Sequence, residues 1–163
     1  MLTDKDLEPF YKVVEDYLAE VESVYKGKLE DRKATGNLIN SISTKYVLNG
    51  NEVICTIELE HYYYWVEHGR KPTSKGKHCP IEPIITWVKA KGIIPQERNG
   101  KLPSETQLAY AIRAKIDREG YKGGKYLQST LDEVNKKYEP LMQEALTQCV
   151  MEYIINYYEI LPW

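Results

Sequence analysis

The spacing of apolar residues changes twice along the chain, and this change most limits the folds that it can adopt. Apolar side chains recur at helical spacing from Leu7 to Val24, alternate with polar ones from Ser43 to Leu59, and return to helical spacing from Leu131 to Tyr158. The first pattern indicates amphipathic helices and the second a half-buried strand pair. The sequence therefore predicts an α+β fold with a small antiparallel sheet flanked by helices.

The N-terminal segment, residues 1–27, is expected to form a helix. We expect it to begin near Pro9, because proline is tolerated in the first turn of a helix. Gly27 follows the apolar pattern at the place where a glycine C-cap ends a helix. The simplest interpretation of the apolar face is core packing.

The expected sheet is a hairpin around Asn49-Gly50. A type I′ turn needs positive φ at both central residues, and this dipeptide satisfies that need. Val53, Cys55 and Ile57 then alternate with polar residues, which predicts one covered face. We expect Cys55 to be a small core residue there. Ile54, on the outer row, indicates partial cover on the second face.

Short helices are expected in the middle of the chain. Residues 61–68 read as a short helix or turn. Proline early and Gly92 late predict a helix over residues 80–92. Ser104 and Gln107 form a capping box that opens a further helix, which ends at Gly120. The following segment, GYKGGKY, reads as a loop or an extended arm.

The C-terminal segment is expected to be long and helical, with a break or kink at Pro140, which lacks a backbone donor. At 163 residues the chain has the usual size of one domain. We therefore expect a single domain, residues 1–163, with an α+β core over residues 34–133 and a helical extension over residues 134–163. The apolar end of that extension is expected to dock on its own core or on a neighbouring protein.

Composition and charge exclude several classes of protein. The formal net charge of −2 argues against general nucleic-acid binding, which needs a basic surface. No apolar run reaches the roughly 20 residues that a membrane span requires. The charged N-terminus does not resemble a secretory signal, so we expect synthesis in a cytoplasm. The three dispersed cysteines predict reduced thiols rather than a disulfide framework.

The chain has 14 tyrosines and one phenylalanine. Tyrosine is favoured where one side of the ring is apolar and the other is wet, as at protein interfaces. A compositional bias of the host would produce the same imbalance, so both explanations stay open.

The segment Tyr62–Gly92 combines an aromatic run, a glycine turn, a basic loop and a short amphipathic helix. This order is typical of a surface that meets another protein. The residues expected at the interface are Tyr63, Tyr64, Trp65, Glu67, Arg70, Lys71, Trp87 and Tyr126.

Catalytic and metal-binding patterns are weak. His61, His68, His78 and Cys79 lie near one another in the sequence, but without the spacing of a zinc motif. Glu58, Glu60 and Glu67 could support acid–base chemistry beside the histidines, although acidic residues on a solvated strand usually only add solubility. No phosphate-binding glycine loop, nucleophile elbow or HExxH motif is present. We expect no catalytic residue, no cofactor and no metal.

Several motifs, in order, resemble the tail-completion and head–tail joining (neck) proteins of long-tailed bacteriophages. The run TGNLINSI at residues 35–42 is similar to the family's TG-x-L-x-x-S-I opening, and YYWVEHG at 63–69 is similar to its YA-x-YVE-x-G. An RKP follows at 70–72, and a W-x-x-x-KG helix at 87–92. The run LAYAIRAKIDREG then leads into a glycine turn and YLQ at 126–128. The chain departs from the family at Tyr63, which replaces a small residue, and beyond Asp132, where the tail is longer and more apolar.

The resemblance implies an α+β subunit of the virion, made in the host bacterial cytoplasm, that assembles into a ring between the capsid portal and the tail. The implied partners are further copies of the chain in a hexamer or dodecamer, the portal or connector and the tail tube, with passing contact to genomic DNA in the lumen and none with membrane. A ring is a heterologous assembly, so one face of each subunit fits a different face of the next.

Two alternatives belong to other classes of protein. One is a small phage-encoded nucleic-acid-binding protein that uses the basic loop at residues 70–77, since basic grooves with aromatic residues bind single strands. The other is a hydrolase built around His61 and His68.

Overall fold

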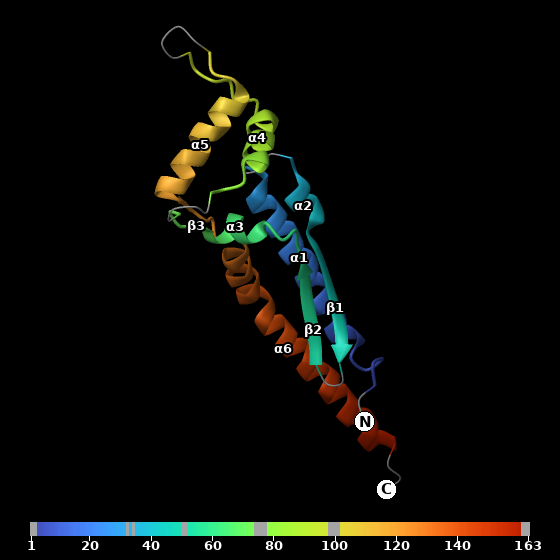
Figure 1. Ribbon diagram of the computed structural model, residues 1–163. Helices are drawn as coiled ribbons and strands as arrows, with labels where there is room; N and C mark the ends of the chain where they lie inside the picture. Colours follow the sequence, from blue (N-terminus) through green and yellow to red (C-terminus); the bar gives the residue numbers. More distant parts are fainter. Residues whose placement is uncertain are drawn as a thin grey trace. The chain divides into compact units, whose positions relative to one another are not determined.

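The computed structural model describes residues 3–31, 33, 35–49, 52–73, 78–97 and 102–160, and side chains up to residue 157. The α+β class expected from the sequence is confirmed: two small antiparallel sheets lie among six helices in this part of the chain (Figure 1). The chain divides into two compact units. Unit 1 comprises Met1–Lys28, Ile42–Glu58 and Tyr126–Trp163, and unit 2 comprises Leu29–Ser41 and Leu59–Lys125. The single-domain organisation stays a prediction.

Unit 1 is built on two antiparallel helices, α1 (Glu8–Glu30) and α6 (Tyr126–Ile160). Val21 of α1 packs with Val134 and Tyr138 of α6 in a buried cluster. Polar contacts follow the same seam, because Lys28 pairs with Glu133 at 2.8 Å and the Tyr138 hydroxyl donates to Glu20 at 2.9 Å. The two helices stabilise each other through one continuous apolar face.

The hairpin of unit 1 consists of β1 (Ser43–Asn49) and β2 (Glu52–Glu58). Its existence is confirmed, but Asn49 lies within β1 opposite Glu52, so residues 50–51 make the connection and lie outside the described residues. Ile57 packs against the α1–α6 cluster, and the Tyr46 hydroxyl donates to Glu15 of α1 at 3.1 Å. One face of the hairpin therefore lies on the helices.

The cover of the hairpin is less complete than its alternation predicts. Cys55 is exposed rather than part of the core, which corrects the expectation for that residue. Val47 and Ile54, which face each other across the two strands, are also exposed. The reason is geometric: a two-stranded ribbon offers little area to two helices, so only part of each apolar row finds a neighbour.

Helix α1 does not end at Gly27, as its sequence predicts, but continues to Glu30. Glycine inside a helix costs about 1 kcal/mol relative to alanine. Leu29 is 2% exposed and Lys28 bonds to α6, so packing of the last turn offsets that cost.

Unit 2 contains α2 (Asn37–Ser41), α3 (Tyr63–His68), α4 (Ile81–Ala90) and α5 (Glu105–Glu119), as well as the short pair β3 (Gly69–Arg70) and β4 (Tyr121–Lys122). Helices α4 and α5 pack through Ile84, Val88 and Ala109, all buried. The capping box at Ser104 is confirmed, since Ser104 Oγ accepts from Gln107 N at 3.2 Å and Gln107 Oε1 accepts from Ser104 N at 2.9 Å. The helices expected over residues 61–68 and 80–92 are also confirmed, as α3 and α4.

Candidate interaction surface

The aromatic run at residues 62–65 lies on α3 and displays two large rings. Tyr64 is 51% exposed and Trp65 is 45% exposed. The two rings meet edge to face with centroids 5.4 Å apart, and the Arg70 guanidinium lies 5.7 Å from the centroid of the Trp65 ring. Exposed rings of this size, fixed by ring contacts and beside a cation, are the side chains that dominate interface energetics. We call Tyr64, Trp65, Arg70 and Lys71 the aromatic surface.

A close backbone approach holds this surface in place. β3 pairs with β4, so that Gly69 faces Lys122 and Arg70 faces Tyr121. The backbone N–H of Gly124 donates to the Val66 carbonyl at 3.0 Å, and that of Lys125 to the Glu67 carbonyl at 3.1 Å. The segments around Gly69 and Lys122, more than fifty positions apart in sequence, are thereby joined at the C-terminal end of α3.

Glycine is required at this junction for two separate reasons. At Gly69 (φ 72°) and Gly120 (φ 69°) the backbone is in the region that favours glycine. An added Cβ would also lie 2.2 Å from the Tyr121 carbonyl oxygen at Gly69, and 2.1 Å from the Glu67 carbonyl oxygen at Gly123. Both distances are impossible for a real side chain, so the glycines permit the β3–β4 contact.

Glu67 differs from its neighbours on α3. Glu67 is only 4% exposed, whereas Tyr64 and Trp65 are about half exposed. Glu67 is thus buried in the described chain, where its backbone carbonyl accepts from Lys125, and its role at an interface stays a prediction.

The remaining expected residues lie at different depths. Lys71 is exposed and follows β3, and Tyr63 and Arg70 are half-buried. Trp87 is 40% exposed on α4, one turn from the buried Ile84 and beside the buried Val88. Its helix is thus anchored by one face while the tryptophan ring remains available on another.

Tyr126 belongs to unit 1, where it is the first residue of α6. It is half-buried, and its carbonyl accepts from the Thr130 hydroxyl at 2.8 Å. The described contact of Tyr126 thus lies within the first turn of the long helix.

Asp117 of α5 was not singled out by the sequence, yet it holds both ends of the basic loop. Its carbonyl accepts from Thr73 N at 2.8 Å, and its Oδ1 accepts from Cys79 N at 2.9 Å. The Nδ1 atom of His78 lies 2.8 Å from Oδ2. Lys75 and Lys77, within the loop, lie outside the described residues. The sequence signal for this role is weak, because Asp117 shares a mostly basic stretch of α5 with a second acidic residue, Glu119.

The pKa of the Asp117 carboxyl lies below its ordinary value of 3.8. The largest cause is the backbone N–H of Cys79, followed by the hydrogen bond from His78 and opposed by partial desolvation. A carboxylate that accepts several hydrogen bonds is stabilised in its charged form. Asp117 is therefore an ionised anchor for this loop at neutral pH.

The histidines considered for chemistry have ring or carboxylate neighbours. His68 lies 4.5 Å from the Tyr64 ring, His61 contacts the Tyr62 ring edge to face, and His78 is paired with Asp117. In the described part of the chain no group of three or more His, Cys, Asp or Glu side chains is placed to hold a metal ion. An open hollow of about 350 Å³ lies beside His78 and Asp117 and is also lined by Tyr110 and Arg113.

Comparison of the chain with family models, curated proteins and solved structures found no match. Among the helices of the described residues, none combines the length and the apolar character needed to cross a membrane. The motifs of the sequence and the surfaces described above are therefore the observations that bear on function.

Proposed function

We propose that this chain is a structural subunit of a bacteriophage virion, a head–tail connector, neck or tail-completion protein. In this proposal it assembles with copies of itself into a ring, a hexamer or dodecamer, and docks the tail to the capsid portal. Its other partners are the portal or connector and the tail tube, with passing contact to genomic DNA. It works by fitting surfaces together and makes no covalent bonds.

One observation carries the proposal: the motifs that resemble the neck family converge on the aromatic surface. The YYWVEHGR motif forms α3 and β3, and the REGYKGG segment forms the end of α5 and β4, which pairs with β3. The glycines of both motifs permit that pairing, and its result is the display of Tyr64 and Trp65. Motifs that resemble those of a family of assembly proteins thus build a surface suited to assembly.

Trp65→Ala and Trp87→Ala test the proposal. Both rings are largely exposed, so their removal is expected to weaken self-association by at least about tenfold, the effect of losing 1.4 kcal/mol. The free energy of unfolding of the monomer should change by less than about 1 kcal/mol. Sedimentation velocity measures association, and urea unfolding at low protein concentration measures stability.

Tyr110→Ala is the matched control, because Tyr110 is an aromatic residue of unit 2 that is 49% exposed on α5. It should leave association unchanged. If Trp65→Ala and Trp87→Ala simply unfold the chain, the rings are structural and the interface assignment is wrong. The role in the virion is tested by particles from a phage with this gene deleted, which should accumulate unjoined heads and tails. Normal infectious particles without the chain would refute it.

Nucleic-acid binding through residues 70–77 is the second candidate function. It is favoured by Arg70, whose guanidinium lies beside the Trp65 ring, and by the exposed Lys71 that follows it in the sequence. It predicts retention on single-stranded DNA that falls steeply as salt is raised, and loss of retention in Lys71→Glu. We rank it second because Arg70 already lies over a ring of its own chain.

A further inference from the structure

Helix α6 extends well past the helix that covers it. In the antiparallel pair, Lys28 bonds to Ser129, and Glu20 contacts Lys137. The step of eight residues back along α1, from Lys28 to Glu20, thus matches the step of eight residues forward along α6, from Ser129 to Lys137. With the same spacing, Glu8, the first residue of α1, stands opposite Cys149, which is buried. The remaining 11 residues of α6, 150–160, form an overhang about 16 Å long, at 1.5 Å per residue.

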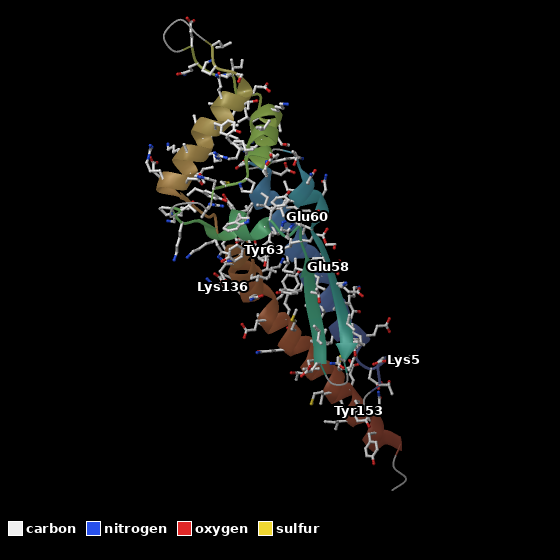
Figure 2. All side chains as sticks on the ribbon, in the orientation of Figure 1. Lys5, Glu58, Glu60, Tyr63, Lys136 and Tyr153 are labelled. Carbon is white, nitrogen blue, oxygen red and sulfur yellow. The ribbon has the colours of Figure 1, made fainter. Side chains whose placement is uncertain are left out.

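The overhang is apolar on most of its circumference. Its exposed apolar side chains are Met151 (54%), Ile154 (42%), Ile155 (52%) and Tyr157 (55%). Tyr153 stacks on Tyr157 with ring centroids 6.4 Å apart, and Figure 2 labels Tyr153 on this last part of α6. Glu152 and Asn156, four residues apart, form the one polar stripe among the described side chains. Helices that are apolar nearly all round are normally buried, so this segment is suited to a partner.

The charge on this end of the molecule is one-sided. No lysine or arginine follows Lys137 in the sequence, whereas four glutamates do: Glu139, Glu144, Glu152 and Glu159. The last turn of α6 therefore carries no basic residue to complement the helix dipole. A basic partner surface would supply what this helix end lacks.

The chain itself contains such a surface, because its two units carry opposite charges. Unit 1 has 15 acidic and 7 basic residues, a formal charge of −8, and unit 2 has 9 acidic and 15 basic residues, a formal charge of +6. Together they give the −2 of the whole chain. Unit 2 also bears the aromatic surface, which combines exposed rings with Arg70 and Lys71.

We propose that the α6 overhang of one copy binds the aromatic surface of the next copy. The apolar side chains of the overhang bury Tyr64 and Trp65, and the glutamates of α6 face the cations of unit 2. This contact joins two different surfaces, so each copy has one free donor and one free acceptor, and repeated contacts build a ring or a chain. The inference rests on the proposed function and specifies the surfaces through which its self-assembly occurs.

A second copy fits the overhang better than a lipid surface does. Helices that lie on membranes carry lysine and arginine on their polar face, which attract anionic headgroups. The polar stripe here consists of Glu152 and Asn156, and the surrounding charge is negative. Anionic lipid repels such a helix, whereas unit 2 of another copy attracts it.

Two variants, each blocking one surface, test the contact. Ile155→Arg places a cation in the overhang, and Lys71→Glu places an anion in the aromatic surface. Each variant alone should associate at least tenfold more weakly than the wild-type chain in sedimentation velocity. An equimolar mixture should associate again, because the intact overhang of the Lys71→Glu chain meets the intact aromatic surface of the Ile155→Arg chain.

The controls separate this contact from general effects of charge and hydrophobicity. Ile94→Arg introduces the same change at an isoleucine of unit 2 that is 80% exposed, and Lys89→Glu changes the charge of unit 2 by the same amount on α4. Both should associate like the wild-type chain. Far-UV circular dichroism and thermal unfolding of the monomers verify that each variant folds.

The outcomes distinguish this inference from the proposed function. If the wild-type chain assembles but Ile155→Arg assembles equally well, the overhang is not the contact and only the inference fails. A variant mixture that stays monomeric overturns it as well, and so does binding of the wild-type chain to anionic vesicles that Ile155→Glu abolishes without any effect on assembly. If the wild-type chain does not assemble at any concentration, the proposed function itself fails.

Discussion

At the scale of single residues, the most demanding feature is the meeting of three glycines beneath α3. Gly69 and Gly120 combine positive φ with close backbone contact, whereas Gly123 is required by space alone. The family-like motif reads VEHG in one place and REGYKGG in another, and the sequence alone does not say that these glycines touch. Their backbone roles become visible only in the β3–β4 pair.

Gly123→Ala is expected to lower the free energy of unfolding by at least about 2 kcal/mol, because its Cβ would lie 2.1 Å from the Glu67 carbonyl oxygen. Gly27→Ala provides the control. Gly27 lies inside α1 with no atom within 4 Å of an added Cβ, so alanine should raise stability by about 0.5–1 kcal/mol. Urea unfolding measures both. Equal effects of the two substitutions would contradict the glycine junction.

Asp117→Asn should destabilise the chain at neutral pH and much less in acid. The pKa of Asp117 is depressed in the folded chain, chiefly by the Cys79 N–H, so its contribution is present above the unfolded pKa. That contribution is lost as pH falls through the folded pKa, which lies below 3.8. Unfolding curves at pH 7 and well below pH 3.8 should therefore show a wild-type advantage that disappears in acid. An advantage independent of pH would show that the carboxylate charge is not responsible.

At the scale of elements, the long helices show where tertiary packing overrides the local sequence signals for the end of a helix. The hairpin and the helices α3, α4 and α5 follow from patterns that the sequence displays. The extension of α1 beyond Gly27 does not, because it depends on the burial of Leu29 and on the contact of Lys28 with α6. The β3–β4 pair was also not predicted, since two-residue strands are too short to show alternation.

Pro140 is the clearest departure from expectation. The sequence predicts a break or kink there. The helix does not break, because α6 is one helix of 35 residues that contains Pro140, and the kink stays a prediction. Proline at this position removes its own donor and leaves the carbonyl of Lys136 without its helical partner. Lys136 and Pro140 are both exposed, so the interruption lies on the solvent side of α6, while the buried Tyr138 and Ala145 hold the helix on either side.

Pro140→Ala should therefore stabilise the chain by about 1–3 kcal/mol, because it restores a helical hydrogen bond without disturbing buried packing. Thermal unfolding followed by circular dichroism measures the change. Glu139→Ala, at the neighbouring exposed position, should have little effect. A Pro140→Ala chain less stable than wild type would mean that the proline conformation is itself required for packing in unit 1.

At the scale of the whole molecule, the division of charge between the two units was hidden by the near-neutral total. A formal charge of −2 argues against a strongly basic binding protein, yet unit 2 alone is markedly basic and unit 1 markedly acidic. The positive charge of unit 2 lies in the continuous stretch Leu59–Lys125, which has 13 basic and 7 acidic residues, whereas the negative charge of unit 1 is spread over three separate stretches. The excess of tyrosine is consistent with this account, because Tyr64 and Tyr157 lie on the two surfaces proposed to meet.

Of the residues predicted for the interface, the structure exposes the aromatic ones most clearly. Tyr64, Trp65 and Trp87 are near half exposed, Glu67 is buried and Tyr126 belongs to unit 1. The interface itself stays a prediction. The sequence did not separate Glu67 from its exposed neighbours, because the burial of one residue on a short helix depends on contacts with segments distant in sequence.

Native mass spectrometry of the purified wild-type chain, over a range of protein concentrations, tests the central claim most directly. Assembly into a ring predicts a closed oligomer of one discrete stoichiometry, in exchange with a monomer of 19.0 kDa. A spectrum that contains only the 19.0 kDa monomer at every concentration would contradict the account.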